Sequence, residues 1–385
     1  NIESKDPAQV ITGNERVVRP RLSDAEFFFN TDRKKNLSQM NEPLKNVVFQ
    51  AQLGTVYEKA ERISRLAKFI AHKIGANEAW AERAGLLCKA DLSSEMVGEF
   101  PELQGIMGMY YARHDNEPEE IAIALNEQYM PRFAGDQLPA THTGAAVAIA
   151  DKLDTLVGIF GIGKPPSGDK DPFGLRRATL GVLRILIGRG YELNLSELIG
   201  HAIIGYETRI NHDTTLSEVL TFMQGRYRAL FQEEGIAVDT INAVAKLEVN
   251  APLDFYNRIQ AVSAFRKLPE AAALAAANKR VANILAKAEG FVAGEVNAAL
   301  LSEEQEKALA EALTAKQAEV APLFAKRDYK TALTSLASLR DVTDAFFDKV
   351  MVNADDAAIR QNRLNLLSQL KGLFVQVADI SELQG

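Results

Sequence analysis

A chain of 385 residues with 47% hydrophobic and 25% charged residues has the composition of an ordinary globular protein, with room for two or three domains. Its single cysteine, Cys88, excludes an internal disulfide and a cysteine-rich zinc site, and is typical of a reducing compartment, so we expect a cytoplasmic protein. The formal net charge of −7 argues against a protein coated in nucleic acid or lying on an anionic membrane, although a local basic patch suffices for a contact face.

The first residues contain neither a starting methionine nor a signal-peptide pattern. Asn1 therefore indicates that the sequence begins inside a longer protein. No apolar run is long enough to span a bilayer, so we expect no membrane partner.

Residues 10–30 have the weakest helical pattern in the chain. Segments 10–12 and 16–19 are rich in β-branched residues, and Gly13 and Asn14 between them are a turn signal. Pro20 and three consecutive phenylalanines follow. This pattern predicts a short β-hairpin near the N-terminus, with at least one phenylalanine packed against a neighbouring element.

From about residue 45 the apolar residues recur at helical spacing. The clearest stripe runs from Ala146 to Phe160 and is stopped by Gly161, Gly163 and Pro165. No alternation of strands and helices is present, which predicts an all-α, multi-domain fold rather than a doubly wound sheet. Helices are expected in these segments: 47–53, 60–70, 84–87, 146–160, 172–189, 216–231, 240–247, 269–288, 303–325, 328–351 and 355–378.

Histidines and acids suggest one catalytic hypothesis. His72, the pair His114-Asp115 and the downstream Asp151 supply the ligand types that a metal-dependent phosphohydrolase of the HD class needs on separate helices. His212-Asp213 lacks such a setting and is interpreted as a surface turn. By the number and type of possible ligands alone, the set needed for a metal site is therefore complete.

The context of the ligands favours a different alignment of the HD pattern. The apolar helix that precedes the His-Asp pair in such proteins corresponds here to residues 84–89, which places Cys88 and Lys89 at the ligand positions. The first-helix histidine then falls near Arg62, and Asp151 alone keeps its type. We therefore expect an HD-like helical domain without a metal, and keep the working phosphohydrolase as the alternative.

Basic residues gather in the polar loop and helix of residues 164–189. Lys164, Lys170, Arg176 and Arg177 suggest contact with nucleic-acid phosphate, and the helix N-terminus could add its amides. The alternative is a solvated loop whose cations pair with local acids such as Asp169 and Asp171.

The C-terminal helices contain the residue types that bind unpaired bases: guanidinium for phosphate or base edge, amide for base edge, and ring for stacking. Arg363 has the alternative of pairing with Asp344 or Asp348, and these two acids, at i, i+4, are interpreted as salt-bridge partners rather than an acid–base pair. The candidate contact residues are Lys279, Arg280, Asn283, Tyr329, Arg340, Arg360, Asn362 and Arg363.

Other catalytic patterns are missing or incomplete. The sequence has no Gly-x-Ser-x-Gly elbow, no Gly-x-Gly-x-x-Gly loop following a strand and no Walker A loop. Cys88 as a nucleophile needs a nearby histidine that the sequence does not identify. We expect no catalytic residue in this chain.

Four segments in order resemble one family, the β subunits of bacterial glycyl-tRNA synthetase. They are residues 13–29 (GNERVVRPRLSDAEFFF), 99–105 (EFPELQG), 168–177 (GDKDPFGLRR) and 339–352 (LRDVTDAFFDKVMV). The last is similar to a motif of the anticodon-binding domain that is akin to the one in arginyl-tRNA synthetase. The resemblance extends from about residue 10 to the end and identifies the chain as a C-terminal fragment of such a subunit.

The resemblance implies a division of labour in an α2β2 heterotetramer. The α subunit carries the class II active site and uses glycine, ATP and Mg, so no cofactor is expected on this chain. The β subunit binds tRNA(Gly), with the C-terminal helices on the anticodon and the HD-like and N-terminal parts on the body and acceptor arm. A purely structural partner of α is the remaining alternative. The domains expected are residues 1–45, 46–205 (HD-like), 206–270 (connecting) and 271–385 (anticodon-binding).

Overall fold

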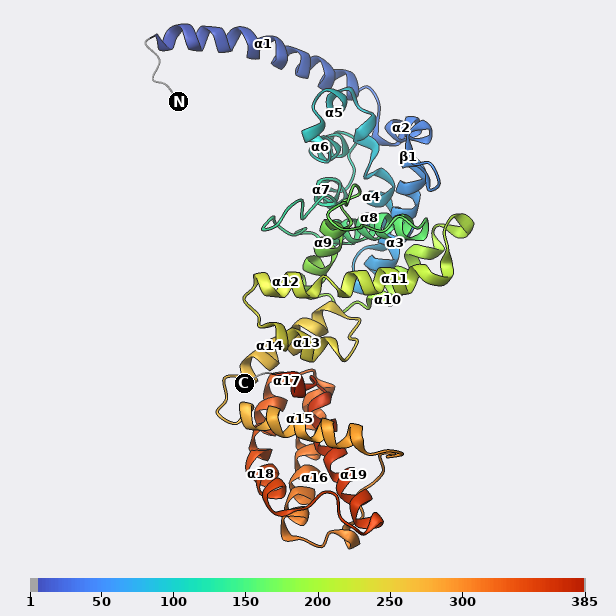
Figure 1. Ribbon diagram of the computed structural model, residues 1–385. Helices are drawn as coiled ribbons and strands as arrows, with labels where there is room; N and C mark the ends of the chain where they lie inside the picture. The colour runs from blue at the N-terminus through green and yellow to red at the C-terminus, as the bar shows by residue number, and fades with distance from the viewer. Residues whose placement is uncertain (1–5, 384–385) are drawn as a thin grey trace. The chain divides into compact units, whose positions relative to one another are not determined.

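Helices make up most of the computed structural model, which describes residues 6–383 (Figure 1). Among these residues the only sheet is an antiparallel pair of short strands, β1 (Val48–Gln50) and β2 (Gly54–Thr55). The predicted mainly helical fold is confirmed, although this strand pair replaces the helix expected over residues 47–53. No helix within residues 6–383 is long and apolar enough to cross a bilayer.

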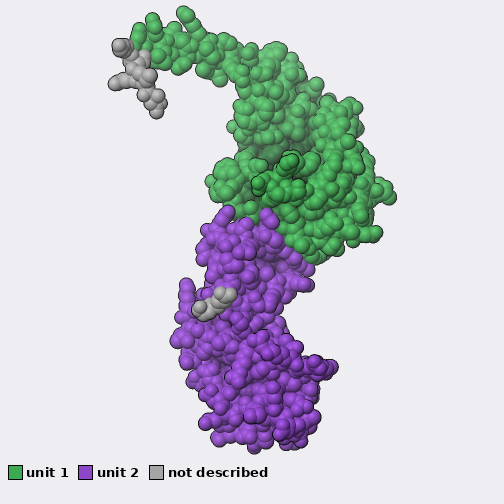
Figure 2. All heavy atoms as spheres, viewed as in Figure 1, with its two compact units in different colours: residues 1–223 green, residues 224–385 purple. Residues whose placement is uncertain are grey.

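The chain divides into two compact units, unit 1 (Asn1–Met223) and unit 2 (Gln224–Gly385), which Figure 2 colours separately. The division falls inside the predicted connecting segment, residues 206–270. The finer division into four parts stays a prediction.

The predicted hairpin over residues 10–19 is wrong, because this segment lies in helix α1 (Pro7–Asp32). The Asp6 carboxylate accepts a hydrogen bond from the amide of Gln9 (3.3 Å), and Pro7 occupies the first turn, where its missing N–H leaves no bond unmade. This start signal outweighs the β-branched residues that follow it. Most of α1 is exposed, so burial does not select a strand-like alternation.

The last turns of α1 attach it to the rest of unit 1. The Asp32 carboxylate accepts hydrogen bonds from two amides at the start of α5 (Glu95–Glu99), at 2.9 and 3.0 Å, and from the hydroxyl of Tyr111 at 2.7 Å. Phe29 stacks on the Tyr111 ring with centroids 6.0 Å apart, which confirms that one of the three phenylalanines packs against a neighbour. Arg21 forms an ion pair with the last residue of α5 (3.5 Å).

Unit 1 is built around helix α8 (His142–Gly161), which is apolar on nearly all sides and almost entirely buried. α3 (Val56–Ile74) starts at a capping box and packs against both α8 and α4 (Glu78–Leu87). Gly85 allows α3 and α4 to approach closely, because a Cβ there would lie 2.6 Å from the Cα of Ser64. The other elements are α2 (Leu37–Asn41), η1 (Glu42–Asn46), η2 (Ala90–Ser93), α5, η3 (Pro101–Leu103), α6 (Ile106–His114), α7 (Glu119–Glu127), α9 (Leu175–Gly188), α10 (Leu195–Ile204), η4 (Glu207–Arg209) and α11 (His212–Gln224).

Unit 2 is a helical bundle in which α15 (Ala271–Lys287) and α16 (Glu304–Ala325) both pack against α19 (Ala357–Val375). The helix expected over residues 328–351 is broken at 337–339, where a 3₁₀ turn separates two shorter helices. The other elements are α12 (Tyr227–Glu233), α13 (Val238–Ala245), α14 (Pro252–Phe265), η5 (Ala298–Leu300), α17 (Tyr329–Leu336), η6 (Ala337–Leu339), α18 (Arg340–Lys349) and η7 (Ile380–Glu382).

A buried ion pair fastens α19 to the start of α16. The Arg363 guanidinium donates to the Glu306 carboxylate and to the carbonyl of Met351 (2.6 Å). The side chain of Glu306 is fully buried and also accepts from the amides of Ser302 (2.7 Å) and Glu303 (2.8 Å). The suggested partners of Arg363, Asp344 and Asp348, are therefore wrong.

We predict that R363A lowers the free energy of unfolding by about 3–5 kcal/mol, because it leaves the Glu306 carboxylate buried without its cation. Urea denaturation of the purified chain measures the change. The matched control is K330A, which removes one positive charge from an exposed side chain that has no partner among the described residues. Equal midpoints for the two variants would contradict the prediction.

Candidate nucleic-acid interface

The four positions that the sequence alignment assigned to an HD pattern, Arg62, Cys88, Lys89 and Asp151, lie in or beside a cluster of buried charges. The Lys89 ammonium is 2.8 Å from the Asp151 carboxylate. Arg62 instead pairs with Asp154, its Nε lying 2.7 Å from Oδ1. Lys59 completes the cluster at 2.9 Å from Asp151 and 3.1 Å from Asp154.

Lys59 and Asp154 were not identified from the sequence. A signal for them exists in their spacing. Lys59 and Arg62 are three residues apart on α3, and Asp151 and Asp154 are three residues apart on α8, so each pair shares a helix face. Opposite charges at matching intervals on two buried helices indicate facing ion pairs.

The charges in the cluster hold one another in the ionised state. Burial alone would raise the pKa of Asp151, but the ammonium groups of Lys59 and Lys89 outweigh it and keep that pKa well below its ordinary value. Burial alone would lower the pKa of the Lys89 ammonium, but the neighbouring Asp151 carboxylate outweighs it and raises that pKa above its ordinary value. Burial raises the pKa of the Cys88 thiol to about 12, so the thiol is protonated near neutral pH. Cys88 therefore lacks the thiolate that a nucleophile needs.

The other histidines and acids of the metal hypothesis have roles in holding the fold. His114 accepts a hydrogen bond from Arg33 (3.4 Å), and Asp115 accepts one from the Leu37 amide (2.7 Å), so the pair ties α6 to the start of α2. His72 forms a surface contact with Glu78 (2.8 Å). Within residues 6–383, no group of three or more His, Cys, Asp and Glu side chains could hold a metal ion.

The basic loop of residues 164–177 is partly occupied by its own contacts. The Asp171 carboxylate accepts from the amides of Leu175 (2.8 Å) and Arg176 (2.9 Å), so it takes the α9 N-terminal amides that were expected to face phosphate. Arg176 donates to the carbonyl of Gly168. Three predicted cations keep exposed side chains without a partner among the described residues: Lys164, Lys170 and Arg177.

In unit 2, three of the eight predicted C-terminal residues share a groove of about 540 Å³ along α15, here called the α15 groove. Lys279, Arg280 and Asn283 line it, with Lys287 one turn further along. The Arg280 guanidinium lies 4.3 Å from the centroid of the Phe347 ring, which fixes it in a cation–π contact. The full lining is Ala276, Lys279, Arg280, Asn283, Ile284, Lys287, Ala288 and Asn353.

Sequence reasoning missed Lys287 and Asn353. Lys287 lies four residues after Asn283 and hence on the same helix face, which the α15 periodicity could have revealed. Asn353 comes from the loop after α18, and only the fold brings it to the groove.

The other five predicted residues are placed elsewhere in unit 2 and contact the protein itself. The Tyr329 hydroxyl donates to Asp254 (2.6 Å), and Arg340 pairs with Asp344 (3.6 Å). Arg360 donates to a loop carbonyl (2.7 Å), Asn362 bonds the backbone of residue 297 (2.7 and 3.1 Å), and Arg363 forms the buried pair described above. A tRNA contact by any of these residues stays a prediction.

We predict that the purified chain retains no stoichiometric Mn, Fe or Zn after incubation with each metal and desalting. The reason is that Lys59 and Lys89 place positive charges against the one HD carboxylate that kept its type. Elemental analysis by mass spectrometry measures the content. Retention of one metal ion per chain would contradict the prediction and restore the phosphohydrolase hypothesis.

Comparisons with known proteins match two successive parts of the chain. A family model described as "Glycyl-tRNA synthetase beta subunit" matches residues 1–246, and a model described as "DALR anticodon binding domain" matches residues 274–380, which contain the α15 groove. The resemblance found from the sequence motifs is therefore confirmed.

Curated relatives match along the whole chain. The glycine–tRNA ligase beta subunit of Ectopseudomonas mendocina (strain ymp) is 58% identical over 383 residues, covering 100% of this chain and 56% of the relative. That of Pseudomonas aeruginosa (strain LESB58) is 58% identical over 381 residues, covering 99% and 56%. That of Aeromonas salmonicida (strain A449) is 58% identical over 384 residues, covering 100% and 56%. The chain thus spans little more than half the length of these relatives, and it belongs to the family of glycyl-tRNA synthetase β subunits.

Proposed function

We propose that this chain binds tRNA(Gly) through the α15 groove of its anticodon-binding domain and orients the tRNA for glycylation in an α subunit. The observation that supports this most directly is the charge of the groove. Its lining contains three cations and no carboxylate, although the whole chain has a net charge of −7. Such a local excess is what an RNA backbone requires.

The residue types in the groove divide into two roles. Lys279 and Lys287 are flexible point charges suited to phosphate, and Arg280 combines charge with a planar surface backed by a ring. Asn283 and Asn353 have side-chain amides with no partner among the described residues, so each is free to read a base edge. Phosphate contacts would position the tRNA, and amide contacts would select its anticodon.

The contribution of this chain to catalysis is then orientation rather than chemistry. Glycine activation with ATP and Mg is assigned to the α subunit of an α2β2 assembly in the cytoplasm. Holding the anticodon places the distant acceptor end of the tRNA and converts tRNA identity into rate. Two other functions are less well supported. The HD phosphohydrolase is disfavoured by the ammonium groups at Asp151, and a purely structural subunit leaves the charge of the α15 groove without a purpose.

We predict that K279A, R280A and K287A each weaken tRNA(Gly) binding and reduce the slope of log K against log salt by about 0.7–1 per lost phosphate contact. N283A is expected to leave the slope unchanged and to cost about 1–3 kcal/mol of discrimination against a tRNA with another anticodon. Filter binding over a salt series, with and without the α subunit, measures both quantities.

K330A is again the control, because it removes the same charge from an exposed lysine of unit 2 outside the groove. Two results would overturn the proposal. One is the absence of tRNA binding both by the chain alone and in the presence of α. The other is a loss of affinity in K330A as large as that in the groove variants.

A further inference from the structure

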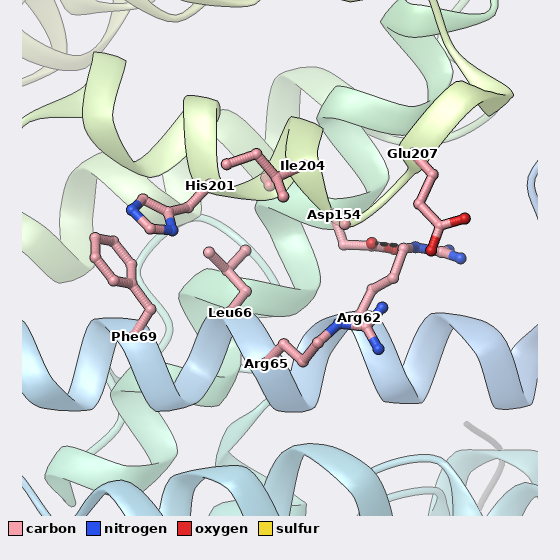
Figure 3. A pocket seen from close by; sticks show the side chains of 10 residues that line it. Arg62, Arg65, Leu66, Phe69, Asp154, His201, Ile204 and Glu207 are labelled. Atoms are coloured by element: carbon pink, nitrogen blue, oxygen red, sulfur yellow. Dashed lines mark hydrogen bonds and ion pairs between the residues drawn. The ribbon is translucent and has the colours of Figure 1, made fainter.

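A second pocket, in unit 1, has no role in the function proposed above. It has a volume of about 460 Å³, within the range of small-molecule sites, and lies between α3, α8, α10 and η4. Figure 3 shows a charged end, an apolar middle and an aromatic end. Its lining is Arg62, Arg65, Leu66, Phe69, Asp154, His201, Ala202, Ile204, Gly205 and Glu207. We call it the α3–α10 pocket.

The charged end borders the buried ion cluster through the Arg62–Asp154 pair, whose Nε and Oδ1 are 2.7 Å apart. Arg62 and Asp154 form part of the pocket wall. Because Asp154 already compensates the Arg62 guanidinium, the attraction of this end for a further anion rests on Arg65.

Arg65 places a second guanidinium at this end. Its side chain is exposed and forms no hydrogen bond or ion pair with any described residue, although it lies next to the Arg62–Asp154 pair (Figure 3). A planar guanidinium with all its donors free is well suited to a phosphate group, which accepts two parallel hydrogen bonds.

Glu207 is the second acid of the same end, beside Asp154, and its backbone is strained. It has φ of +51°, in the left-handed region that non-glycine residues seldom adopt. Such strain is often found where a side chain is held for a ligand. The Glu207 carboxylate accepts no hydrogen bond from a described residue, so it is free to accept from a hydroxyl.

The rest of the pocket offers apolar and aromatic contacts. Leu66 and Ile204 lie between the two ends in Figure 3, and Ile204 is 67% exposed, unusually open for a large apolar side chain. Phe69 and His201 stack with ring centroids 3.5 Å apart and an interplanar angle of 18°. The His201 ring nitrogens have no hydrogen-bond partner among the described residues, so they can meet the polar edge of a flat ligand.

We propose that the α3–α10 pocket binds a ribonucleotide. The phosphate binds Arg65 beside Arg62, a ribose hydroxyl donates to Glu207, and the base covers Leu66 and Ile204 with its edge toward His201. The site is a binding site only, with no bond made or broken. The ribonucleotide comes either free from solution or as an unpaired residue of an RNA chain, and the same three contacts serve both. This inference does not depend on the α15 groove.

Calorimetric titration of the whole chain with AMP, GMP, CMP and UMP tests the proposal, with inorganic phosphate, ribose 5-phosphate and adenosine as fragments of the ligand. We expect saturable binding of at least one nucleotide, tighter than any fragment. R65A should weaken it about tenfold or more, since a charge-assisted bond pair is lost. R16A is the matched control, because Arg16 is equally exposed and unpartnered but lies on α1.

E207A provides a second, independent readout. The wild-type chain should prefer the tightest-binding nucleotide to its 2′-deoxy form, and E207A, which removes the acceptor oxygens, should lose that preference while keeping its phosphate affinity. Competition with tRNA(Gly), in the wild type and in K279A, distinguishes the sources. Displacement of the nucleotide in both proteins supports an RNA residue, and its retention supports a free nucleotide.

Three outcomes would overturn the proposal. They are the absence of saturable binding for all four nucleotides, binding no tighter than that of inorganic phosphate, and equal losses in R65A and R16A. Thermal melts of each variant confirm that the comparison is made on folded protein.

Discussion

Buried charges must lie next to charges of opposite sign, and the packing of the central helices of unit 1 depends on this constraint. Asp151 lies on the most buried helix of the unit, and its carboxylate is tolerable there only because Lys59 and Lys89 approach from α3 and from the end of α4. The same contacts therefore join α3 and α8 to the turn that follows α4.

Internal ion pairs also decide which polar residues of unit 2 are free for a ligand. Glu306 pairs with Arg363. Asp254 pairs with Arg258 (2.8 Å) and accepts a hydrogen bond from Tyr329. These side chains are therefore engaged in contacts within the bundle. α15 has no such acid facing its groove, and its cations stay available. An arginine or tyrosine in a helix is thus informative about binding only once its internal partners are known.

The sequence carries the helical architecture well, because periodicity records which face of a helix is buried. Periodicity gives no such information where a helix is exposed, as along α1. There the β-branched residues suggested a hairpin, although the Asp6-Pro7 start signal favoured a helix. Sequence reasoning also missed Lys59, Asp154 and Asn353, since their importance lies in contacts between segments far apart in the chain. Residue types pointed to the α15 face, and the structure shows which of the candidate polar side chains are engaged in internal pairs and which are exposed.

The attachment of α1 has a mechanical consequence. The contacts described above between α1 and the rest of unit 1 run from Arg21 to Asp32, and residues 7–20 continue the helix beyond them as an exposed arm with Pro20 at its base. At 1.5 Å per residue that arm is about 20 Å long, and a tilt of about 10° at its base moves the tip by about 3–4 Å. The contacts of Arg21, Phe29 and Asp32 therefore set the direction in which α1 leaves unit 1, and Pro20, which lacks a backbone N–H, marks the point where the arm can bend.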